Sequence, residues 1–598
     1  MLVFGDLRRT EASVDKLDRI RERLASACDV RGIDAHARRV DALIEAGELL
    51  QGVADARFQV QGQRDATLPC DEIFAVTRLT SALAQAVAVS WQQGFERSFE
   101  TPDALIAHCG QLLRGEALQF KQAEGFAFYA LYPEAYLMAA HAARRTMPGR
   151  WRVIGLRSIG TTLASIVGAA LGDAVPLTVR PLGPPFERRV AVEANWPGAP
   201  HADHYAVVDE GPGLSGSSVA AVVQRLRNAG AQAEAVHIFP GHGGGPGPEA
   251  TSAVHALWRA SPSHVVDFDR LALHPASDRH RLSNWVEALA GPLTRPLEEI
   301  SGGGWRRAHG LGPSQQPPVH PWQERRKFLA TTARGPWLVK FNGLGHLARE
   351  RLECARQLGQ AGFSPEVEGL CHGFMVERWH GELRPLHLQA LQNADARSRL
   401  LERLADYIAF RALHLPAPPA AGATLLALTQ MAERNSRLAL GHATGVQWLG
   451  HHALAPHLQA RVRAVRTDNR MQVWEWIGDG RRLLKTDAID HHGGHDLIGC
   501  QDPAWDVAGA TAEFDLPACA RATLCALLER RGCAVDAHLL DFLQPVYLAF
   551  QLGSFSLAAE GTRDLQERER LCRHARRFYR EPLLQWMLMR NGGLSPQA

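Results

Sequence analysis

Two adjacent carboxylates, Asp209 and Glu210, follow a short β-branched run and precede a loop of Gly, Pro and Ser that extends to Ser218. Beyond the loop, apolar residues recur at helical spacing, at Val219, Val222, Val223 and Leu226. Small residues allow backbone amides to close around a phosphate, and the N-terminus of the helix adds partial positive charge. The sequence therefore predicts a strand, an anion-binding loop and a helix, with acids placed to hold the hydroxyls of a ribose 5-phosphate.

The stretch from Val207 to Ser218 resembles the PRPP-binding signature of type I phosphoribosyltransferases, in which two acids precede a Ser/Thr-Gly-x-Ser/Thr loop. The resemblance implies that Asp209 and Glu210 hold ribose hydroxyls in catalysis and that PRPP is a co-substrate. It also implies that the 5′-phosphate is bound by Gly213, Ser215, Gly216, Ser217 and Ser218. In this chain the spacer between Glu210 and Gly216 is one residue longer than is usual in that family.

A second strand-to-loop transition is expected upstream, where residues 151–156 lead into a loop of Ser, Gly and Thr. In phosphoribosyltransferases the equivalent loop binds pyrophosphate, which implies that role for Arg157, Ser158, Gly160, Thr161 and Thr162. We expect Arg180 to act on the same group, whereas Arg188 and Arg189 fit a solvated face equally well. Ligands collect at the carboxyl ends of parallel strands, so strand ends near 156, 208 and 239 are expected to share one crevice.

The run from Lys121 to Tyr136 is dense in aromatic residues and leads into this part of the chain. Such a run fits a plain hydrophobic core, and it also fits a stacking wall for a flat base. Tyr129 and Tyr136 are therefore candidate ligand contacts. His242, in the glycine-rich turn after the third strand, is more simply explained as incidental.

The C-terminal half carries a second set of chemical residues. Lys340 lies in the second strand of an expected hairpin, and a helix expected over 347–362 carries Glu350 and Glu353. A strand lysine paired with a helix glutamate positions nucleotide phosphates in kinase folds. We take Glu350 as the partner because it shares a helix face with apolar residues, and Glu353 remains the alternative.

The segment from Arg466 to Ala508 resembles aminoglycoside-phosphotransferase-like kinases, with a catalytic Asp loop, a hairpin, a metal-binding Asp and a closing Asp-Pro-Ala-x-Asp motif in that order. The resemblance implies Asp468 as the catalytic base and Asp487 as the principal Mg²⁺ ligand. Gln472 stands in for the metal-binding Asn. ATP and Mg²⁺ are the implied cofactors.

The closing motif contains Asp502 and Asp506, which we expect to hold the catalytic loop rather than to react. The nearby His491, His492 and His495 could suggest zinc. Local hydrogen bonding is favoured over a metal cage for these histidines, because their neighbours are rich in Asp.

These motifs predict a multidomain chain of α/β and α+β class. A helical N-terminal region is followed by a phosphoribosyltransferase-like parallel sheet and then by a two-lobed kinase-like domain. The expected segments are 1–95 for the helical region, 96–275 for the parallel-sheet domain, 276–322 for a linker and the start of the kinase N-lobe, and 323–598 for the kinase-like domain.

Composition limits the partners. The chain has 598 residues and a formal net charge of +3, with 66 basic and 63 acidic side chains, so nothing indicates a nucleic-acid or membrane partner. Ten cysteines without a CxxC pair indicate reduced thiols, and no uncharged apolar run is long enough for a membrane span. We expect a cytoplasmic protein that acts on small molecules, and the oligomeric state stays open.

Two functions are compatible with these observations. The first is a bifunctional enzyme with a PRPP-dependent (phospho)ribosyl transfer site and an ATP-dependent phosphotransferase site. The alternative is a regulatory or sensor protein whose PRPP and nucleotide sites bind without turnover. The longer spacer after Glu210 and the Arg466-Thr467 pair, which replaces the usual His-Gly, motivate the alternative.

Overall fold

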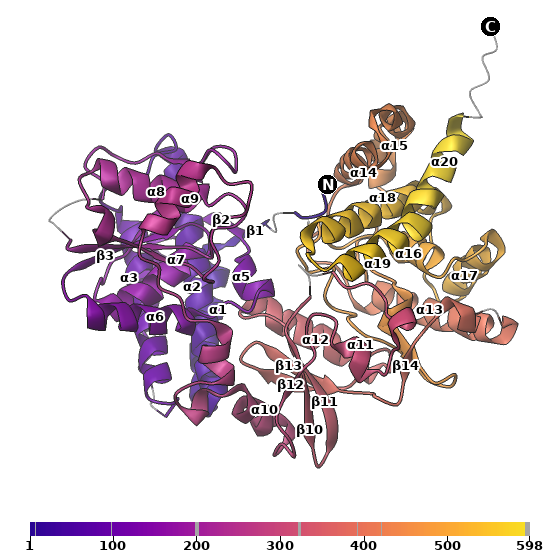
Figure 1. Ribbon diagram of the computed structural model, residues 1–598, viewed down its shortest axis with the longest axis horizontal. Helices are drawn as coiled ribbons and strands as arrows, with labels where there is room; N and C mark the ends of the chain where they lie inside the picture. Colours follow the sequence, from indigo (N-terminus) through magenta and orange to yellow (C-terminus); the bar gives the residue numbers. More distant parts are fainter. Residues whose placement is uncertain are drawn as a thin grey trace, which may run out of the picture.

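The computed structural model describes residues 1–5, 8–96, 99–197, 202–320, 324–391, 393–419 and 421–591. In Figure 1 the chain forms two masses, the N-terminal one in indigo and magenta and the C-terminal one in orange and yellow. The first residues of the chain lie on the C-terminal mass. There the Leu497 amide donates to the Val3 carbonyl at 2.8 Å, and the Gly5 amide donates to the His495 carbonyl at 3.1 Å.

The N-terminal region is helical, as its Ala- and Leu-rich periodicity predicts. Its helices are α1 (Ser13–Cys28), α2 (Gly32–Val60), α3 (Asp71–Gln92) and α4 (Asp103–Leu112). An unexpected strand, β1 (Arg8–Ala12), pairs antiparallel with β2 (Ala117–Lys121). Among the described helices, α3 has the length and apolarity of a membrane span, yet 61% of its most apolar window is buried inside the protein, as in a core helix.

A four-stranded parallel sheet, in the order β4-β3-β7-β8, forms the centre of the first half. The strands are β3 (Trp151–Leu156), β4 (Leu177–Val179), β7 (His204–Val208) and β8 (Val236–Phe239). The predicted strand ends at 156, 208 and 239 are confirmed. Because all four strands are parallel, their carboxyl ends lie along one edge.

Helices cover both faces of this sheet (Figure 1). The crossover α7 (Gly160–Leu171) packs with α2, α3 and α6 (Pro133–Thr146), and α8 (Ser217–Asn228) packs on the opposite face beside α9 (Ser252–Ala260). The predicted apolar stripe of α8 is buried. A small hairpin, β5 (Pro181–Leu182) and β6 (Arg189–Val190), lies between β4 and β7 in the sequence.

The second half begins with a five-stranded antiparallel sheet in the order β12-β13-β11-β10-β9. Its strands are β9 (Glu298–Glu299), β10 (Lys327–Thr332), β11 (Gly335–Phe341), β12 (Val367–Cys371) and β13 (Phe374–Arg378). The predicted hairpin and the following helix, α12 (His346–Gln360), are confirmed. Helices α10 (Leu282–Ala290) and α11 (Trp305–Ala308) occupy the segment expected as a linker.

A helical lobe completes the chain. Its helices are α13 (Ala394–His414), α14 (Leu425–Leu440), α15 (Leu449–Gln459), α16 (Pro503–Glu513), α17 (Ala518–Arg530), α18 (Ala537–Gly561), α19 (Leu565–Ala575) and α20 (Glu581–Asn591). A small sheet of β14 (Arg384–Pro385), β15 (Trp476–Gly478) and β16 (Leu483–Lys485) includes the hairpin predicted after the catalytic loop.

The hydrophobic core does not follow the predicted domain boundaries. One cluster includes Leu43 of α2, Val153 of the parallel sheet and Phe374 of the five-stranded sheet, so these three parts share one core. A second cluster fills the helical lobe, and a smaller one lies under α8. Burial of a common apolar surface therefore fixes the five-stranded sheet to the first half.

Candidate functional site

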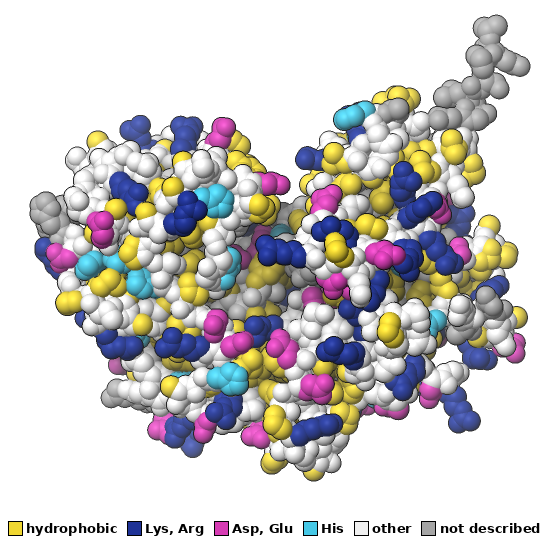
Figure 2. Space-filling view, viewed as in Figure 1, with side chains coloured by type: hydrophobic (Ala, Val, Ile, Leu, Met, Phe, Trp, Pro, Cys, Tyr) yellow, Lys and Arg dark blue, Asp and Glu magenta, His cyan; other side chains and the backbone are white. Residues whose placement is uncertain are grey.

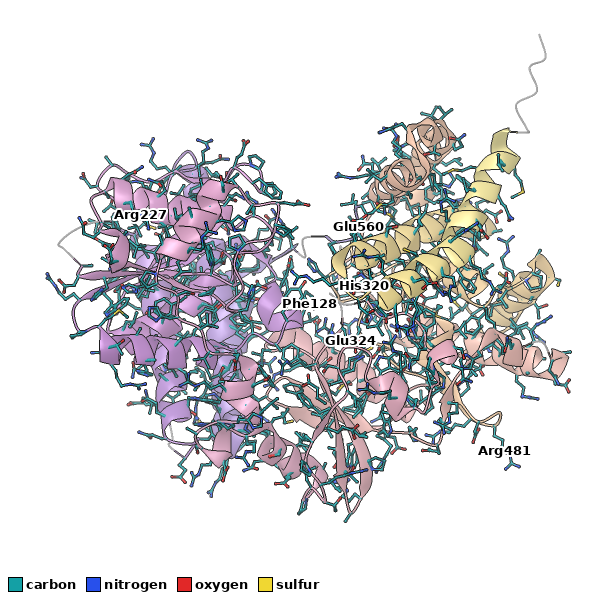
Figure 3. The ribbon with its side chains drawn as sticks, in the orientation of Figure 1. Phe128, Arg227, His320, Glu324, Arg481 and Glu560 are labelled. Carbon is teal, nitrogen blue, oxygen red and sulfur yellow. The ribbon has the colours of Figure 1, made fainter. Side chains whose placement is uncertain are left out.

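A cavity of about 410 Å³ lies where the five-stranded sheet, the helical lobe and the first half meet. The first half contributes Phe128 and Tyr129, at the end of α5 (Glu124–Phe128). In Figure 3, Phe128, His320 and Glu324 lie close together at this junction, and Figure 2 shows a hollow between the two masses. Basic and acidic side chains are interspersed on the face seen in Figure 2.

Charged side chains of both signs line the cavity. The basic ones are Arg325, Arg326, Lys327, Lys340 and Arg470, and the acidic ones are Glu324, Glu475, Asp487, Asp490 and Asp496. Cations of this kind bind phosphate, and carboxylates bind hard divalent cations. The lining therefore suits a phosphorylated ligand that carries a metal ion.

Lys340, on β11, lies at the centre of these charges. Its ammonium is hydrogen-bonded to Asp487 and to Asp490, and it is almost completely buried. Burial acts to raise the pKa of Asp487, but the ammonium groups of Lys340 and Lys327 hold it well below its usual range. Both ions of the pair are therefore charged, and together they join the sheet to the segment that follows the β15–β16 hairpin.

The predicted ion pair between Lys340 and Glu350 is wrong. Glu350 instead contacts His346, one turn earlier in α12, at 3.0 Å. The residue that α12 directs inward is Arg351, which donates to the backbone carbonyls of Ala127, Asn342 and Gly493 at 3.0, 2.7 and 3.0 Å.

Glu353, the alternative partner, is also excluded, because it accepts a hydrogen bond from Gln357 at 3.0 Å. The carboxylates that reach Lys340 come from the segment after the hairpin. The sequence analysis did not identify Asp490 as a site residue, although it lies three residues after Asp487, directly after the apolar residues Ala488 and Ile489.

Asp468, expected as the catalytic base, is 1% exposed and does not line the cavity. Tyr407 donates a hydrogen bond to its Oδ2, and Lys485 Nζ lies 3.3 Å from the same oxygen. These contacts hold the carboxylate in the interior, outside the lining of the cavity. In this structure Asp468 therefore contacts Tyr407 and Lys485, and its role as the catalytic base stays a prediction.

The closing motif holds the loop as predicted. Asp506 accepts hydrogen bonds from the amides of Asp468 and Asn469 at 2.8 and 3.0 Å. Asp502 caps α16 by accepting from the Ala504 amide at 2.9 Å, and it also accepts from the Arg463 amide at 3.0 Å.

The catalytic-loop residues that do line the cavity are Arg470, Gln472 and Glu475. Arg470 forms an ion pair with Asp496, with nitrogen–oxygen distances of 2.9 and 3.1 Å. Burial raises the pKa of Glu475 to about 8, although Lys485 lies 2.7 Å from it and acts to lower the pKa. Glu475 was missed because it lies just before β15, outside the motif that the sequence suggested.

The site fits the Mg²⁺ ion that the motif implies. Two buried oxygens, Gln472 Oε1 and Asp490 Oδ1, have no hydrogen-bond partner among the described residues. Asp487 Oδ2 is 3.9 Å from Lys327, and the Asp487 side chain keeps 29% of its surface exposed. Carboxylate and amide oxygens are ligands that Mg²⁺ accepts, so the donors present fit this ion, and the metal-binding role of Gln472 and Asp487 stays a prediction.

The three neighbouring histidines do not converge on one point. His491 Nδ1 lies 3.7 Å from Asp496, His492 Nδ1 lies 3.2 Å from Arg411, and His495 Nε2 lies 3.2 Å from Glu124. Each ring contacts a different partner, as expected for local polar contacts rather than a zinc cage.

The acid pair of the first half lies at the carboxyl edge of the parallel sheet. Tyr136 Oη donates to the Asp209 carbonyl at 2.8 Å, and the Gly241 amide donates to the Glu210 carbonyl at 2.7 Å. Burial raises the pKa of Asp209 to about 7, and burial together with Glu124 and Asp209 raises that of Glu210 to about 8. Both residues keep part of their surface accessible, whereas Tyr136 is buried and positions the backbone.

The predicted phosphate loop has the expected bends, but one of its hydroxyls already has a partner within the chain. Gly213 and Gly216 have φ of 55° and 60°, which glycine adopts readily. Ser215 Oγ lies 3.0 Å from Ser217 Oγ, and Ser217 donates to the Pro185 carbonyl of the β5–β6 hairpin. Ser218 lies in the first turn of α8. A neighbouring segment thus takes a hydroxyl that was assigned to the 5′-phosphate.

The predicted pyrophosphate cations are neutralised within the chain. Arg157 is hydrogen-bonded to Asp65, and Arg180 Nε donates to Asp55 Oδ1 at 2.9 Å. Arg180 Nη1 also donates to the Arg157 carbonyl at 2.8 Å. We expected both arginines to be free to bind pyrophosphate, and the structure contradicts this. Asp55 of α2 and Asp65 in the segment after it, neither of which belongs to the local motif, pair with them.

The remaining residues of that loop are packed against the N-terminal helices. Thr161 Oγ1 donates to the Gly47 carbonyl of α2 at 2.8 Å, and Thr162 Oγ1 occupies the space where a Cβ on Gly47 would lie. The Ser158 carbonyl accepts from Thr161, at 2.6 Å. Gly160 lies against β7, since a Cβ there would be 2.9 Å from the Val208 carbonyl oxygen. These four residues are positioning residues of the fold in this structure.

One segment touches both candidate sites. At Gly125 of α5, an added Cβ would lie 3.1 Å from the carboxyl carbon of Glu210. Three residues later Phe128 lines the 410 Å³ cavity, and Tyr129 Oη lies 2.9 Å from His495 Nδ1. Part of the aromatic run, for which a hydrophobic core and a ligand wall were both possible, therefore lies between the acid pair and the cavity.

No protein-family model matches the chain, and no curated protein matches it. Among solved structures, the chain is similar to choline kinase LicA from Streptococcus pneumoniae, with 13% identity and a TM-score of 0.33 over 49% of this chain and 96% of that one. It is also similar to a choline/ethanolamine kinase family protein from Mesorhizobium loti, with 16% identity and a TM-score of 0.33 over 50% and 93% of the two chains. It is similar as well to an ethanolamine kinase from Plasmodium vivax, with 11% identity and a TM-score of 0.31 over 50% of this chain and 86% of that one. These TM-scores are low, so we base the functional interpretation on the geometry of this chain alone.

The acid pair predicts a pH dependence of stability. Because the pKa values of Asp209 and Glu210 are raised in the folded state, to about 7 and about 8, their favourable contribution is complete below the usual carboxyl range near 4 and is lost as the pH rises through 7–8. In thermal denaturation, Asp209→Asn should melt about 2–4 °C above wild type at pH 8.5. At pH 4 the variant and the wild type should have the same melting temperature. The exposed Glu249→Gln serves as the control, and a pH-independent difference for Asp209→Asn would contradict the assignment.

The buried contacts of Asp468 predict a stability defect. Asp468→Asn removes the charge that Tyr407 and Lys485 contact, although Lys485 keeps Glu475 and Tyr407 keeps Arg411 as partners, so we expect urea denaturation to show a loss of about 1–3 kcal/mol. Nucleotide affinity of the folded variant should stay near that of wild type. Wild-type stability combined with a selective loss of turnover would instead support Asp468 as the base.

Proposed function

We propose that the C-terminal half is an ATP- and Mg²⁺-dependent phosphotransferase with a kinase-like fold, acting on a small compound that carries a hydroxyl group. The proposal rests chiefly on Lys340, whose buried ammonium joins Asp487 and Asp490 at the wall of a 410 Å³ cavity. A strand lysine and metal-binding carboxylates between two lobes are among the parts that kinases use for phosphoryl transfer, although Glu350 does not pair with the lysine here.

In this proposal Asp487, Asp490 and Gln472 hold Mg²⁺, which supplies charge neutralisation for the phosphates when bound. Lys340 and Arg470 contribute fixed positive charge to the lining of the cavity. Phosphoryl transfer depends mainly on positioning and charge stabilisation, so a loop without an accessible aspartate base can still support it. Glu475, with its raised pKa, is the carboxylate best placed to accept the hydroxyl proton.

In the first half, the ion-paired arginines favour a site that binds a ligand over one that transfers a phosphoribosyl group. Arg157 and Arg180 already have carboxylate partners, while Asp209 and Glu210 keep accessible surface at the sheet edge. We therefore propose that this half binds a sugar-containing ligand without releasing pyrophosphate. PRPP as a co-substrate, part of the bifunctional hypothesis, is disfavoured because both arginines expected to bind pyrophosphate have internal carboxylate partners.

Mass spectrometry of a small-metabolite extract incubated with the protein, ATP and Mg²⁺ tests the proposal. We expect one class of compound to gain a phosphoryl group, and Asp487→Asn to reduce this gain by at least about 100-fold because it removes a metal ligand. Parallel incubation with PRPP should release no pyrophosphate.

The matched control is Asp541→Asn, an exposed acid in the same lobe whose contact with Arg521 is 3.3 Å long. It should retain full activity, and circular dichroism should report both variants as folded. A phosphoryl gain that survives Asp487→Asn would exclude this cavity as the active site.

A further inference from the structure

A buried cluster of His36, Glu134 and His372 lies outside both candidate sites. The three residues come from α2, the first turn of α6 and the turn between β12 and β13, so they meet only in the folded chain. All three side chains have no exposed surface. His36 Nε2 and His372 Nε2 each lie 2.8 Å from the same oxygen, Glu134 Oε1.

The cluster leaves metal-ligating atoms without partners. Glu134 Oε2 and His372 Nδ1 form no hydrogen bond with any residue that the structure describes. An unpaired carboxylate oxygen in a fully buried position is unfavourable unless something else binds it. No Lys or Arg of the described chain forms an ion pair with Glu134.

We propose that His36, Glu134 and His372 form a structural binding site for a divalent transition metal such as Zn²⁺. Two imidazole nitrogens and a carboxylate oxygen are a ligand set that Zn²⁺ accepts. The candidate ligand atoms all lie within 4.8 Å of one another. Tetrahedral zinc bonds place ligand atoms about 3.4 Å apart, so an ion requires each 2.8 Å contact to open by about half an ångström.

The surroundings hold the rings in place. Ser90 Oγ lies 3.0 Å from His36 Nδ1, on the side of the ring that faces away from Glu134. Tyr132 Oη donates to the His372 carbonyl at 2.8 Å. Such outer contacts orient metal-binding histidines. His372 also lines a separate cavity of about 270 Å³.

The proposed ion joins parts that are distant in the sequence. His36 belongs to the N-terminal helices, Glu134 to the helix before the parallel sheet, and His372 to the five-stranded sheet. Since the cluster is fully buried, the ion has no room for substrate. Its role is to fasten the second half to the first.

Cobalt and zinc titration of the chelator-treated, full-length protein tests the site. We expect one Zn²⁺ per chain by elemental analysis after desalting and a rise in melting temperature of about 5 °C. We also expect intense visible absorption from four- or five-coordinate Co²⁺, which an oxygen-rich Mg²⁺ site does not give.

His372→Asn is the critical variant, because Asn tolerates the left-handed backbone that His372 adopts, with φ of 41°. The variant should lose the bound zinc, the cobalt absorption and the metal-dependent rise in melting temperature. His264→Asn is the control, since His264 contacts His237 at 3.1 Å in a histidine cluster without a carboxylate. Its metal binding should match that of wild type.

Two results would overturn the proposal. One is a wild-type protein that retains no zinc after desalting and shows no metal-dependent change in melting temperature. The other is zinc and cobalt binding that His372→Asn leaves unchanged. Either result would make the cluster a purely hydrogen-bonded contact. Neither result bears on phosphotransferase activity, which is measured separately.

Discussion

The buried ion pair between Lys340 and the two aspartates, Asp487 and Asp490, is the interaction on which the second half depends. It connects the five-stranded sheet to the helical lobe at the wall of the 410 Å³ cavity. Removing one partner of a buried pair costs about 3–5 kcal/mol, because the remaining charge is left without compensation. The same charges that hold the lobes together are therefore those that a nucleotide and its metal would engage. Ligand binding must exchange these internal contacts for contacts with phosphate and metal.

In the first half, too, charged side chains are paired with each other inside the protein. Four parallel strands bring the loop after β3, Arg180 and the acid pair to one edge, as an open α/β sheet requires. Yet Asp55 and Asp65 neutralise the arginines there. The acid pair alone remains without a cationic contact at hydrogen-bond distance among the described residues. Between this edge and the cavity lies the short α5 segment, so a ligand at Glu210 and one against Phe128 would press on the same five-residue helix.

Local patterns in the sequence predicted local structure well. The strand ends at 156, 208 and 239, the hairpin around Lys340 and the loop-holding role of Asp506 follow from short segments in which periodicity or a motif decides the outcome. The partners of charged side chains could not be predicted in this way. Arg157 is paired with Asp65, 92 positions away, and Lys340 with Asp487, 147 positions away, and neither separation leaves a periodic signal.

Two differences from expectation at the kinase-like site have a common physical cause. Glu350 was chosen from helix spacing, but Arg351 makes three backbone hydrogen bonds that fix which face of α12 turns inward. Asp468 was chosen from its place in a motif, but Lys485 and Tyr407 hold it in the interior, outside the lining of the cavity. In both cases a tertiary contact decided the orientation of a side chain whose secondary structure was correctly expected.

Calorimetric titration of the full-length protein with ATP, in the presence of Mg²⁺ and again in its absence, tests the central claim most directly. If Mg²⁺ takes the oxygens of Asp487 and Asp490 and frees Lys340 for phosphate, one ATP binds per chain and removal of Mg²⁺ weakens binding at least about 10-fold. Undetectable ATP binding, or an affinity that does not depend on Mg²⁺, would contradict the account.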